Sequence, residues 1–238
     1  MKKVLGCLRK TVQDFNMIDE GDRIAVGISG GKDSLTLLKA LRLYQYFSPV
    51  SYELEAVTLT MGFDDFDLTE VETFCNELDI RYTIKHTQIG RIVFDVRHEK
   101  NPCSLCAKMR RGALHNAALE LGCNKVALGH HREDVIETLL LSLFYEGRFN
   151  TFAPVTYLSR KDLTVIRPLV YASEADIKRV AQKHNLPVVK SPCPANGITK
   201  RQDMKDMMRY LNQEIPNSSE QILSALLNSK NINLWEKA

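Results

Sequence analysis

The stretch DRIAVGISGGKDSLTLLKAL, residues Asp22–Leu41, joins two sequence patterns through a glycine turn. Its first part, Asp22–Ser29, is a short apolar run rich in β-branched residues, which is typical of a buried strand. Its last part has apolar residues at helical spacing. A strand that passes directly into a helix in this way is the building unit of parallel sheets with crossover helices. We therefore expect an α/β fold.

The rest of the chain continues the alternation of strand and helix. Strand-like runs follow at residues 52–61, 80–87, 125–131 and 163–170, and helical patterns separate most of them. This order predicts a Rossmann-like parallel sheet of about five strands with helices on both faces. We expect an N-terminal helix in residues 1–20, a main domain in residues 21–198 and a helical extension in residues 199–238.

The composition is that of an ordinary globular protein. The 238 residues are 44% hydrophobic and 26% charged, and the net charge of +3 is too small to indicate nucleic-acid binding. We expect no membrane span and no signal peptide, and hence a cytoplasmic chain in a reducing compartment. The six cysteines are then interpreted as metal ligands, catalytic thiols or core residues rather than disulfides.

The glycine turn has the composition of an anion site. Ser29, Gly30 and Gly31 allow a close approach of the backbone, and the helix that follows presents free N–H groups. Lys32 adds a positive charge, and Asp33 supplies a carboxylate for Mg²⁺. An ordinary glycine turn is the alternative, but it does not explain hydroxyls, a lysine and a carboxylate around one helix N-terminus.

Two familiar phosphate loops are excluded by spacing. A Walker A loop needs four residues between its glycines and Ser or Thr after the lysine, whereas three residues separate Gly27 from Gly31 and Asp33 follows Lys32. The dinucleotide pattern Gly-x-Gly-x-x-Gly fails as well, because Ser29 occupies its second glycine position.

The cysteines suggest a second site. Cys103 and Cys106 lie three apart at a helix start, so both thiolates can face one side. Such a pair fits a redox couple, half a zinc site or part of an iron–sulfur site. Cys193 lies between two prolines, 87 positions after Cys106, and is the one further cysteine well placed for ligation. Packing or core positions are expected for the others, which are Cys7, Cys75 and Cys123.

Three thiolates leave the metal open. They suit a [4Fe–4S] cluster in which one iron has no protein ligand, and they equally suit zinc with a histidine or water in the fourth position. Residue types alone do not separate these two interpretations.

Four motifs together carry a resemblance to a known family. SGGKDS at residues 29–34 resembles the PP-loop of ATP pyrophosphatases, which cleave ATP to AMP and pyrophosphate. It is followed by CSLCAKMRRG at 103–112, GHHREDVIETLLLSLFYEG at 129–147, and Pro-Cys at 192–193 with KRQDMKDMMRYL at 200–211. In this order the motifs resemble the tRNA 2-thiocytidine synthetase family, whose relatives are cluster-dependent tRNA 2-thiouridine enzymes. The match runs from the N-terminal helix to about Leu211.

The resemblance implies a fold, cofactors and partners. It implies a PP-loop/HUP-like fold and a [4Fe–4S] cluster on positions corresponding to Cys103, Cys106 and Cys193. It also implies ATP and Mg²⁺, which activate the C2 oxygen of a cytidine in the tRNA anticodon loop before sulfur replaces it. The sulfur donor would be a cysteine desulfurase product or sulfide, and a homodimer is expected.

The family's chemistry suggests roles for residues at the strand ends. We expect residues 29–34, including Ser34, to hold the pyrophosphate, and the base and AMP to lie near two other strand ends. Asp134 would bind Mg²⁺ or orient the nucleotide; the alternative is a helix N-terminal carboxylate favoured by the dipole. The residues expected near the base and AMP are Thr58, Leu59, Gly129 and His130, and His131 would also shape this pocket. The alternative for both histidines is a packed or hydrogen-bonded side chain.

Two helical segments are rich in cations. They would track RNA phosphates, or they are solvated helix faces. Arg110, one helical turn after Cys106, has the alternative role of facing the cluster and steadying its negative charge. The cations are Lys108, Arg110 and Arg111 in the first segment and Lys200, Arg201, Lys205 and Arg209 in the second.

Other functions stay open at this point. One is a PP-loop ligase that adenylates its substrate and then adds an amine, with the cysteines holding structural zinc. Another is a non-catalytic RNA-binding module with a degenerate nucleotide loop. The segment Pro194–Gly197 reads PANG where the family commonly has Gly-Ser-Gln, so thiolation of a different RNA base or a small molecule is a further alternative.

Overall fold

The computed structural model describes residues 1–63, 66–97, 102–190, 193 and 200–228. Its six-stranded sheet has the spatial order β3-β2-β1-β4-β6-β5. All neighbouring strands pair in parallel except β5, which pairs with β6 antiparallel. The strands are β1 (Asp22–Gly27), β2 (Tyr52–Leu59), β3 (Arg81–Lys85), β4 (Lys125–Ala127), β5 (Val155–Leu158) and β6 (Leu163–Ile166).

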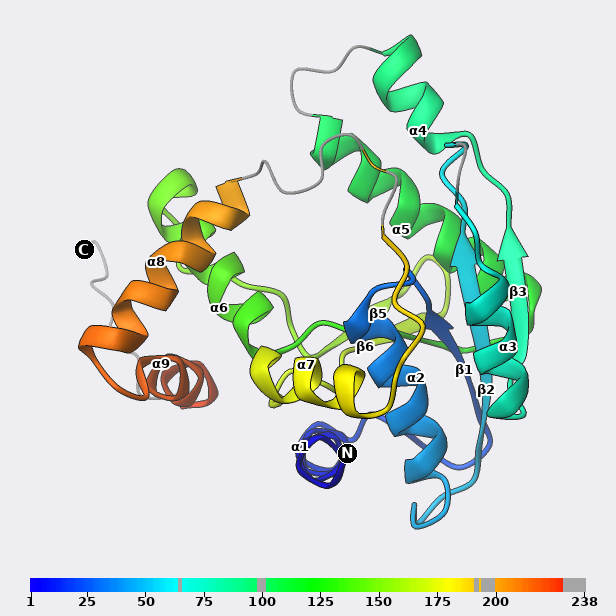
Figure 1. Cartoon of the computed structure of the whole chain (residues 1–238), viewed down its shortest axis with the longest axis horizontal. Helices are drawn as coiled ribbons and strands as arrows, with labels where there is room; N and C mark the ends of the chain where they lie inside the picture. The colour runs from blue at the N-terminus through cyan, green and yellow to red at the C-terminus, as the bar shows by residue number, and fades with distance from the viewer. Residues whose placement is uncertain (64–65, 98–101, 191–192, 194–199, 229–238) are drawn as a thin grey trace. The chain divides into compact units, whose positions relative to one another are not determined.

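Helices separate most of the strands in the chain (Figure 1). None of the helices in the described ranges is long and apolar enough to span a membrane. The helices are α1 (Lys2–Asp14), α2 (Lys32–Tyr44), α3 (Thr69–Glu77), α4 (Ile89–Arg91), α5 (Pro102–Glu120), α6 (Arg132–Leu141), α7 (Glu174–Lys183), α8 (Lys200–Glu214) and α9 (Ser218–Leu227), with π-helical turns η1 (Ile92–Val96) and η2 (Ser142–Glu146).

The chain forms two compact units. The first comprises Met1–His131 and Ala153–Asn196 and contains the whole sheet; we call it the sheet unit. The second comprises Arg132–Phe152 and Gly197–Ala238 and contains α6, α8 and α9; we call it the helical unit.

One face of the sheet is covered by α1, α2, α3 and α7. Alternate residues of β1 divide between the two faces, because successive side chains of a strand point in opposite directions. Ile24 and Val26 join the core under these helices, with Leu8 of α1, Leu38 of α2 and Ile177 of α7, and all five side chains are fully buried. Burial of this apolar surface fixes α2, and with it the glycine turn, on the sheet.

The other face is covered by α5. Ala25 of β1 joins a second core with Leu114 and Ala118 of α5. The packing at the strand end is tight, since a Cβ on Gly27, the last residue of β1, would lie 2.9 Å from Leu114 Cδ2. The helix therefore reaches the carboxyl edge of the sheet at Leu114, and its earlier residues extend beyond that edge, as Figure 1 shows.

The helical unit has a small core of its own. Ile136 and Leu140 of α6 pack with Met204 and Met208 of α8. An ion pair of 2.5 Å between Arg132 of α6 and Glu220 of α9 adds a link at the edge of this core.

The predicted α/β fold, with its alternating order and its helices on both faces, is confirmed. The sheet has six strands rather than about five, because β5 was not predicted. It has only four residues and follows Pro154, so it carries no recognisable alternation. It is an edge strand formed by a tight hairpin in which Asp162 has φ of 47°. The π-helical turns were also not predicted.

Two helix ends are determined by single local residues. Gly122 has φ of 72° and ends α5, as expected for a left-handed C-terminal glycine. Ser173 caps α7 by accepting a hydrogen bond from the backbone N–H of Asp176.

Replacing Leu38 by alanine should test the core that holds α2. Leu38 is 0% exposed, so we expect Leu38→Ala to lower the free energy of unfolding by about 2–5 kcal/mol. Leu119→Ala on α5 is the matched control, because Leu119 is 39% exposed and the change should cost about 0.5 kcal/mol. Urea unfolding of both variants measures the difference, and equal destabilisation would contradict the assignment of the core.

Candidate functional site

The glycine turn between β1 and α2 is a compact loop held by its neighbours. Gly30 has φ of 77°, a left-handed conformation that favours glycine. Its carbonyl oxygen accepts a hydrogen bond of 2.9 Å from the backbone N–H of Val189. The segment that follows α7 is thus attached to the glycine turn.

Two serine hydroxyls fix the shape of the turn. Ser34 Oγ donates to the carbonyl oxygen of Gly31 at 3.0 Å and accepts from the backbone N–H of Ser29 at 3.2 Å. Ser29 Oγ lies 3.2 Å from Ser34 Oγ and accepts from the backbone N–H of Gly31 at 3.3 Å. Since no side chain caps the N-terminus of α2 at Gly31, the first-turn N–H groups are available to an anion.

A cation lies next to this helix end. Lys32 Nζ is 3.1 Å from Asp33 Oδ2 and 3.1 Å from Glu174 Oε1 at the start of α7. Burial alone would lower the pKa of Lys32, but the two carboxylates raise the pKa above its ordinary value. The lysine is therefore fully charged at neutral pH. Glu174 was not predicted as a site residue, because no local motif distinguishes it from any acidic residue in a first helical turn.

The two carboxylate oxygens of Asp33 differ in their hydrogen bonds. Oδ2 accepts from Lys32, whereas Oδ1 is buried and accepts no hydrogen bond from the described residues. His131 Nε2, on a side chain 5% exposed, lies 3.7 Å from Oδ1. A buried carboxylate oxygen that accepts no hydrogen bond is suited to bind a cation. The site therefore fits the Mg²⁺ expected at Asp33.

The candidate residues at the neighbouring strand ends contact the turn in different ways. Thr58 is buried, and its hydroxyl donates to the carbonyl of Ile28 at 2.9 Å and accepts from Tyr82 at 2.8 Å, so it supports the turn. Gly129 lies against the first turn of α2, because a Cβ there would be 2.9 Å from the Asp33 carbonyl carbon and 3.0 Å from the Ser34 nitrogen. Leu59 and His130 are half-buried beside them.

The three candidate cysteines belong to the sheet unit and influence one another. Cys103 is exposed, and Cys106 and Cys193 are half-buried. Burial raises the pKa of the Cys106 thiol, and Cys193 and Cys103 raise this pKa further, while the Arg110 guanidinium lowers it. The structure thus gathers thiols that are 87 positions apart in the sequence. Arg110 lies beside them, as its spacing predicted.

The gathered thiols are not in a coordinating arrangement. Within the part of the chain that the structure describes, no group of three or more His, Cys, Asp or Glu side chains is arranged to hold a metal ion. The donor set itself, three thiols next to an arginine, fits a thiolate-ligated cluster with a net negative charge. The segment Pro194–Gly197 lies outside the described residues.

The remaining cysteines are found in core positions or on α1. Cys75 and Cys123 are buried, and burial raises the pKa of their thiols to about 12 and about 11. They are therefore protonated at neutral pH. Cys7 is half-buried on α1.

Asp134 belongs to the helical unit, in the first turn of α6. Its Oδ1 accepts a hydrogen bond of 3.2 Å from Arg201 of α8, which also lies 3.8 Å from Glu137. On α8, Arg209 pairs with Asp206 at 2.7 Å. The cations of this helix thus have carboxylate neighbours, which favours a solvated and internally paired face over a phosphate track.

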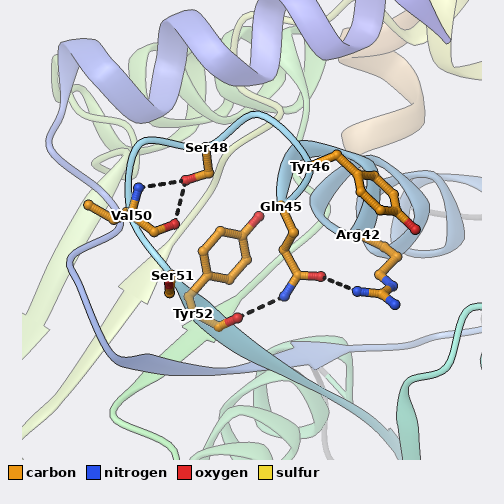
Figure 2. Close-up of a pocket in the computed structure, with 7 residues that line it drawn as sticks. All are labelled: Arg42, Gln45, Tyr46, Ser48, Val50, Ser51 and Tyr52. Carbon is orange, nitrogen blue, oxygen red and sulfur yellow. Dashed lines mark hydrogen bonds between the residues drawn. The ribbon is translucent and has the colours of Figure 1, made fainter.

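A pocket elsewhere in the sheet unit is not part of this site. It lies at the end of α2 and the start of β2, lined by residues in the range 42–52 (Figure 2). Its polar groups bind one another: Arg42 donates to Gln45 at 3.0 Å, and Gln45 donates to the carbonyl of Tyr52 at 2.7 Å. Because β2 begins at Tyr52, the pocket is at the amino ends of the strands, opposite the glycine turn.

Comparisons with known proteins agree with this geometry. The model of the PP-loop domain matches residues 5–205. A tRNA-cytidine(32) 2-sulfurtransferase from Pelobacter propionicus is 43% identical over 222 residues, which cover 92% of this chain and 82% of the relative. Another from Geobacter sulfurreducens is 40% identical over 230 residues, covering 95% and 90%.

A solved structure is also similar to this chain. It is the U34-tRNA thiolase NcsA from Methanococcus maripaludis with its [4Fe–4S] cluster. The match has a TM-score of 0.79 and 26% sequence identity, and it covers 98% of this chain and 79% of the other.

The contact between Gly129 and α2 can be tested with two glycine variants. We expect Gly129→Ala to destabilise the protein by about 1–3 kcal/mol, because the added Cβ meets backbone atoms that cannot move aside cheaply. Gly112→Ala on α5 is the control, since its Cβ meets nothing within 4 Å and should stabilise the helix by about 0.5–1 kcal/mol. Opposite shifts in urea midpoints are expected; a neutral Gly129→Ala would contradict the close approach.

Proposed function

This chain belongs to the PP-loop family that includes the tRNA-cytidine(32) 2-sulfurtransferases, and from that membership we propose that it thiolates tRNA in an ATP-dependent reaction. The proposed target is the C2 oxygen of an anticodon-loop cytidine. Sulfide or sulfur from a cysteine desulfurase is the proposed donor. The reaction would take place in the cytoplasm, and the family suggests a homodimer.

The observation that carries the proposal is that the glycine turn and the thiols of α5 lie in the same unit. The glycine turn follows β1, and Cys106 is eight residues before Leu114, the residue of α5 that packs on the end of β1. Eight helical residues span about 12 Å, so the thiols lie beyond the same edge of the sheet as the turn. An anion site and a group of thiols at one edge suit a reaction that joins ATP chemistry to sulfur chemistry.

The first step depends on the residues of the glycine turn. A ring carbonyl oxygen is a poor leaving group, and adenylation converts it into AMP while releasing pyrophosphate. The N–H groups at the start of α2 and the charged Lys32 would stabilise the negative charge that develops on the phosphates. Asp33, with its buried Oδ1, would hold Mg²⁺ against them.

The second step depends on the cysteines. We propose that Cys103, Cys106 and Cys193 hold an iron–sulfur cluster, a proposal supported by the family resemblance and by the similar thiolase, whose solved structure contains its [4Fe–4S] cluster. When bound, a cluster with one iron free of protein ligands would supply a position for the incoming sulfur. Arg110, which already lowers the pKa of Cys106, would offset the negative charge of the thiolates.

We propose supporting and lining roles for the remaining candidates. Gly129 and Thr58 shape the turn through backbone contacts, and His130 and Leu59 would line the space for the base and AMP. For Asp134, in the first turn of α6, a role in binding Mg²⁺ or orienting the nucleotide rests on the family's chemistry alone, and in the structure its Oδ1 accepts a hydrogen bond from Arg201.

The metal content separates the proposed function from a ligase with structural zinc. We expect protein purified without oxygen to contain about four irons and four labile sulfides per chain. Cys193→Ala should lose them, while Cys7→Ala, which removes a half-buried thiol of α1, should retain them. About one zinc and no sulfide would contradict the cluster and favour the ligase. Mass spectrometry of tRNA incubated with protein, ATP and sulfide tests the product.

Lys32→Ala should impair the adenylation step. The variant removes a charge next to the transferred phosphates, so the rate of pyrophosphate release with ATP and tRNA should fall by roughly 10²-fold or more. Lys183→Ala, at the end of α7, is a control of the same charge change and should keep the wild-type rate. Unchanged pyrophosphate release from Lys32→Ala, with normal iron content, would exclude the proposed role of the turn.

A further inference from the structure

Lys32, at the start of α2, is shared between two carboxylates. Its Nζ lies 3.1 Å from Asp33 Oδ2 and 3.1 Å from Glu174 Oε1. Asp33 is the next residue in the chain, whereas the contact with Glu174 exists only because α7 packs against α2. The side chains of Lys32, Asp33 and Glu174 are 27%, 31% and 24% exposed. Ion pairs that are partly shielded from water in this way are screened less than pairs on the open surface.

The position of Glu174 is determined by α7 and not by the lysine. Glu174 is the first residue of this helix, which the preceding Ser173 caps by accepting from the backbone N–H of Asp176 at 3.1 Å. The Asp176 side chain is 6% exposed and lies 2.8 Å from Lys3 Nζ of α1. Ile177 is fully buried in the core that α7 shares with α2. The carboxylate of Glu174 therefore extends from a fixed helix end.

Asp33 would have two cations to bind in the proposed function. Its Oδ2 accepts from Lys32, and its buried Oδ1, which accepts no hydrogen bond from the described residues, is the proposed ligand of Mg²⁺. A lysine with no other partner would compete with the metal ion for this carboxylate, because two positive charges next to one negative charge repel each other. A second carboxylate beside the lysine reduces this competition.

We propose that Glu174 is a positioning residue, which holds Lys32 beside the first turn of α2 and leaves Asp33 to the divalent cation. The inference rests on the proposed function for the identity of the cation and of the nucleotide. Glu174 acts through its contact of 3.1 Å with Lys32. When Asp33 binds the cation, the lysine keeps one carboxylate partner and stays next to the N–H groups that would face the phosphates.

A simpler explanation of Glu174 is a carboxylate at a helix N-terminus, which the helix dipole favours. Glu70 of α3 is an example of that case: it lies in the first turn of its helix, is exposed, and forms no ion pair with the described residues. Glu174 differs because its carboxylate reaches a cation on another helix. Since the two residues share their type and their place in a helix, Glu70 is the matched control for Glu174.

The test measures how binding of a nucleotide depends on the metal ion. The dissociation constant of a non-hydrolysable ATP analogue is determined over a series of MgCl₂ concentrations. Glu174→Gln removes the charge and keeps the size of the side chain. It should raise the Mg²⁺ concentration at which the gain in affinity is half-maximal by roughly two- to fivefold, the range expected for a partly exposed ion pair. Glu70→Gln makes the same chemical change and should leave this concentration unchanged.

Two further variants examine whether Glu174 acts through the charge of Lys32. In a chain that already carries Lys32→Ala, the competition for Asp33 is absent, so Glu174→Gln should not change the Mg²⁺ series any further. Glu174→Asp keeps the charge on a shorter side chain, and the flexible lysine can follow it. Glu174→Asp should therefore restore most of the wild-type Mg²⁺ dependence.

Three results would overturn the inference. The first is a wild-type Mg²⁺ dependence in Glu174→Gln. The second is tighter binding of the analogue to Glu174→Gln at every Mg²⁺ concentration, which would show that the carboxylate only repels phosphates. The third is an equal effect of Glu174→Gln with and without Lys32. Each is read from nucleotide binding, so absence of tRNA thiolation by a wild-type protein that binds the analogue would refute the proposed function alone.

Discussion

The packing of Leu114 against Gly27 is the constraint on which the arrangement of the site depends. A side chain on Gly27 would lie 2.9 Å from Leu114 Cδ2, so α5 can approach the end of β1 only because that strand ends in glycine. This contact determines how much of α5 extends beyond the sheet. The extending part carries Cys103 and Cys106, and the part at the edge carries Arg111 and His115. A shift of α5 along its axis would displace all of these side chains together.

The distribution of charge separates the two ends of the proposed reaction. At the glycine turn, Lys32 is balanced by Asp33 and Glu174, which keeps a cation charged and oriented without leaving it exposed alone. On the α5 side, the cation nearest the thiols is Arg110, whose charge acts to lower the pKa of Cys106. Lys32 would thus meet the phosphates of ATP, and Arg110 would meet the thiolates.

Local motifs made much of this predictable from the sequence. SGGKDS placed between an apolar strand and an apolar helix was sufficient to predict the turn, because glycine geometry and helix N-terminal N–H groups act over a few residues. The spacing of Arg110 from Cys106 predicted its position, since both lie on one helix. The fold class followed from alternation alone.

What was missed depends on contacts between distant segments. Nothing near Glu174 in the sequence indicates a pairing with Lys32, because α7 and α2 are far apart in the chain and meet only in the folded structure. The same holds for the hydrogen bond between Lys161 and Asn116, because Lys161 lies in a hairpin whose first strand is too short to recognise. The hydrogen bonds of the Thr58 hydroxyl with Ile28 and Tyr82 were not foreseen either, because only the register of β2 and β3 reveals them. The position of Thr58 near the nucleotide stays a prediction.

The third thiol is connected to the glycine turn through the backbone. Val189 donates to the carbonyl of Gly30, and Cys193 follows four residues later, a distance of at most about 14 Å along an extended chain. The accepting carbonyl belongs to Gly30, whose left-handed conformation is part of the glycine turn. A change in the turn on nucleotide binding would therefore move the anchor of the segment that carries Cys193. The chain thus provides a short covalent link between the anion site and the third thiol.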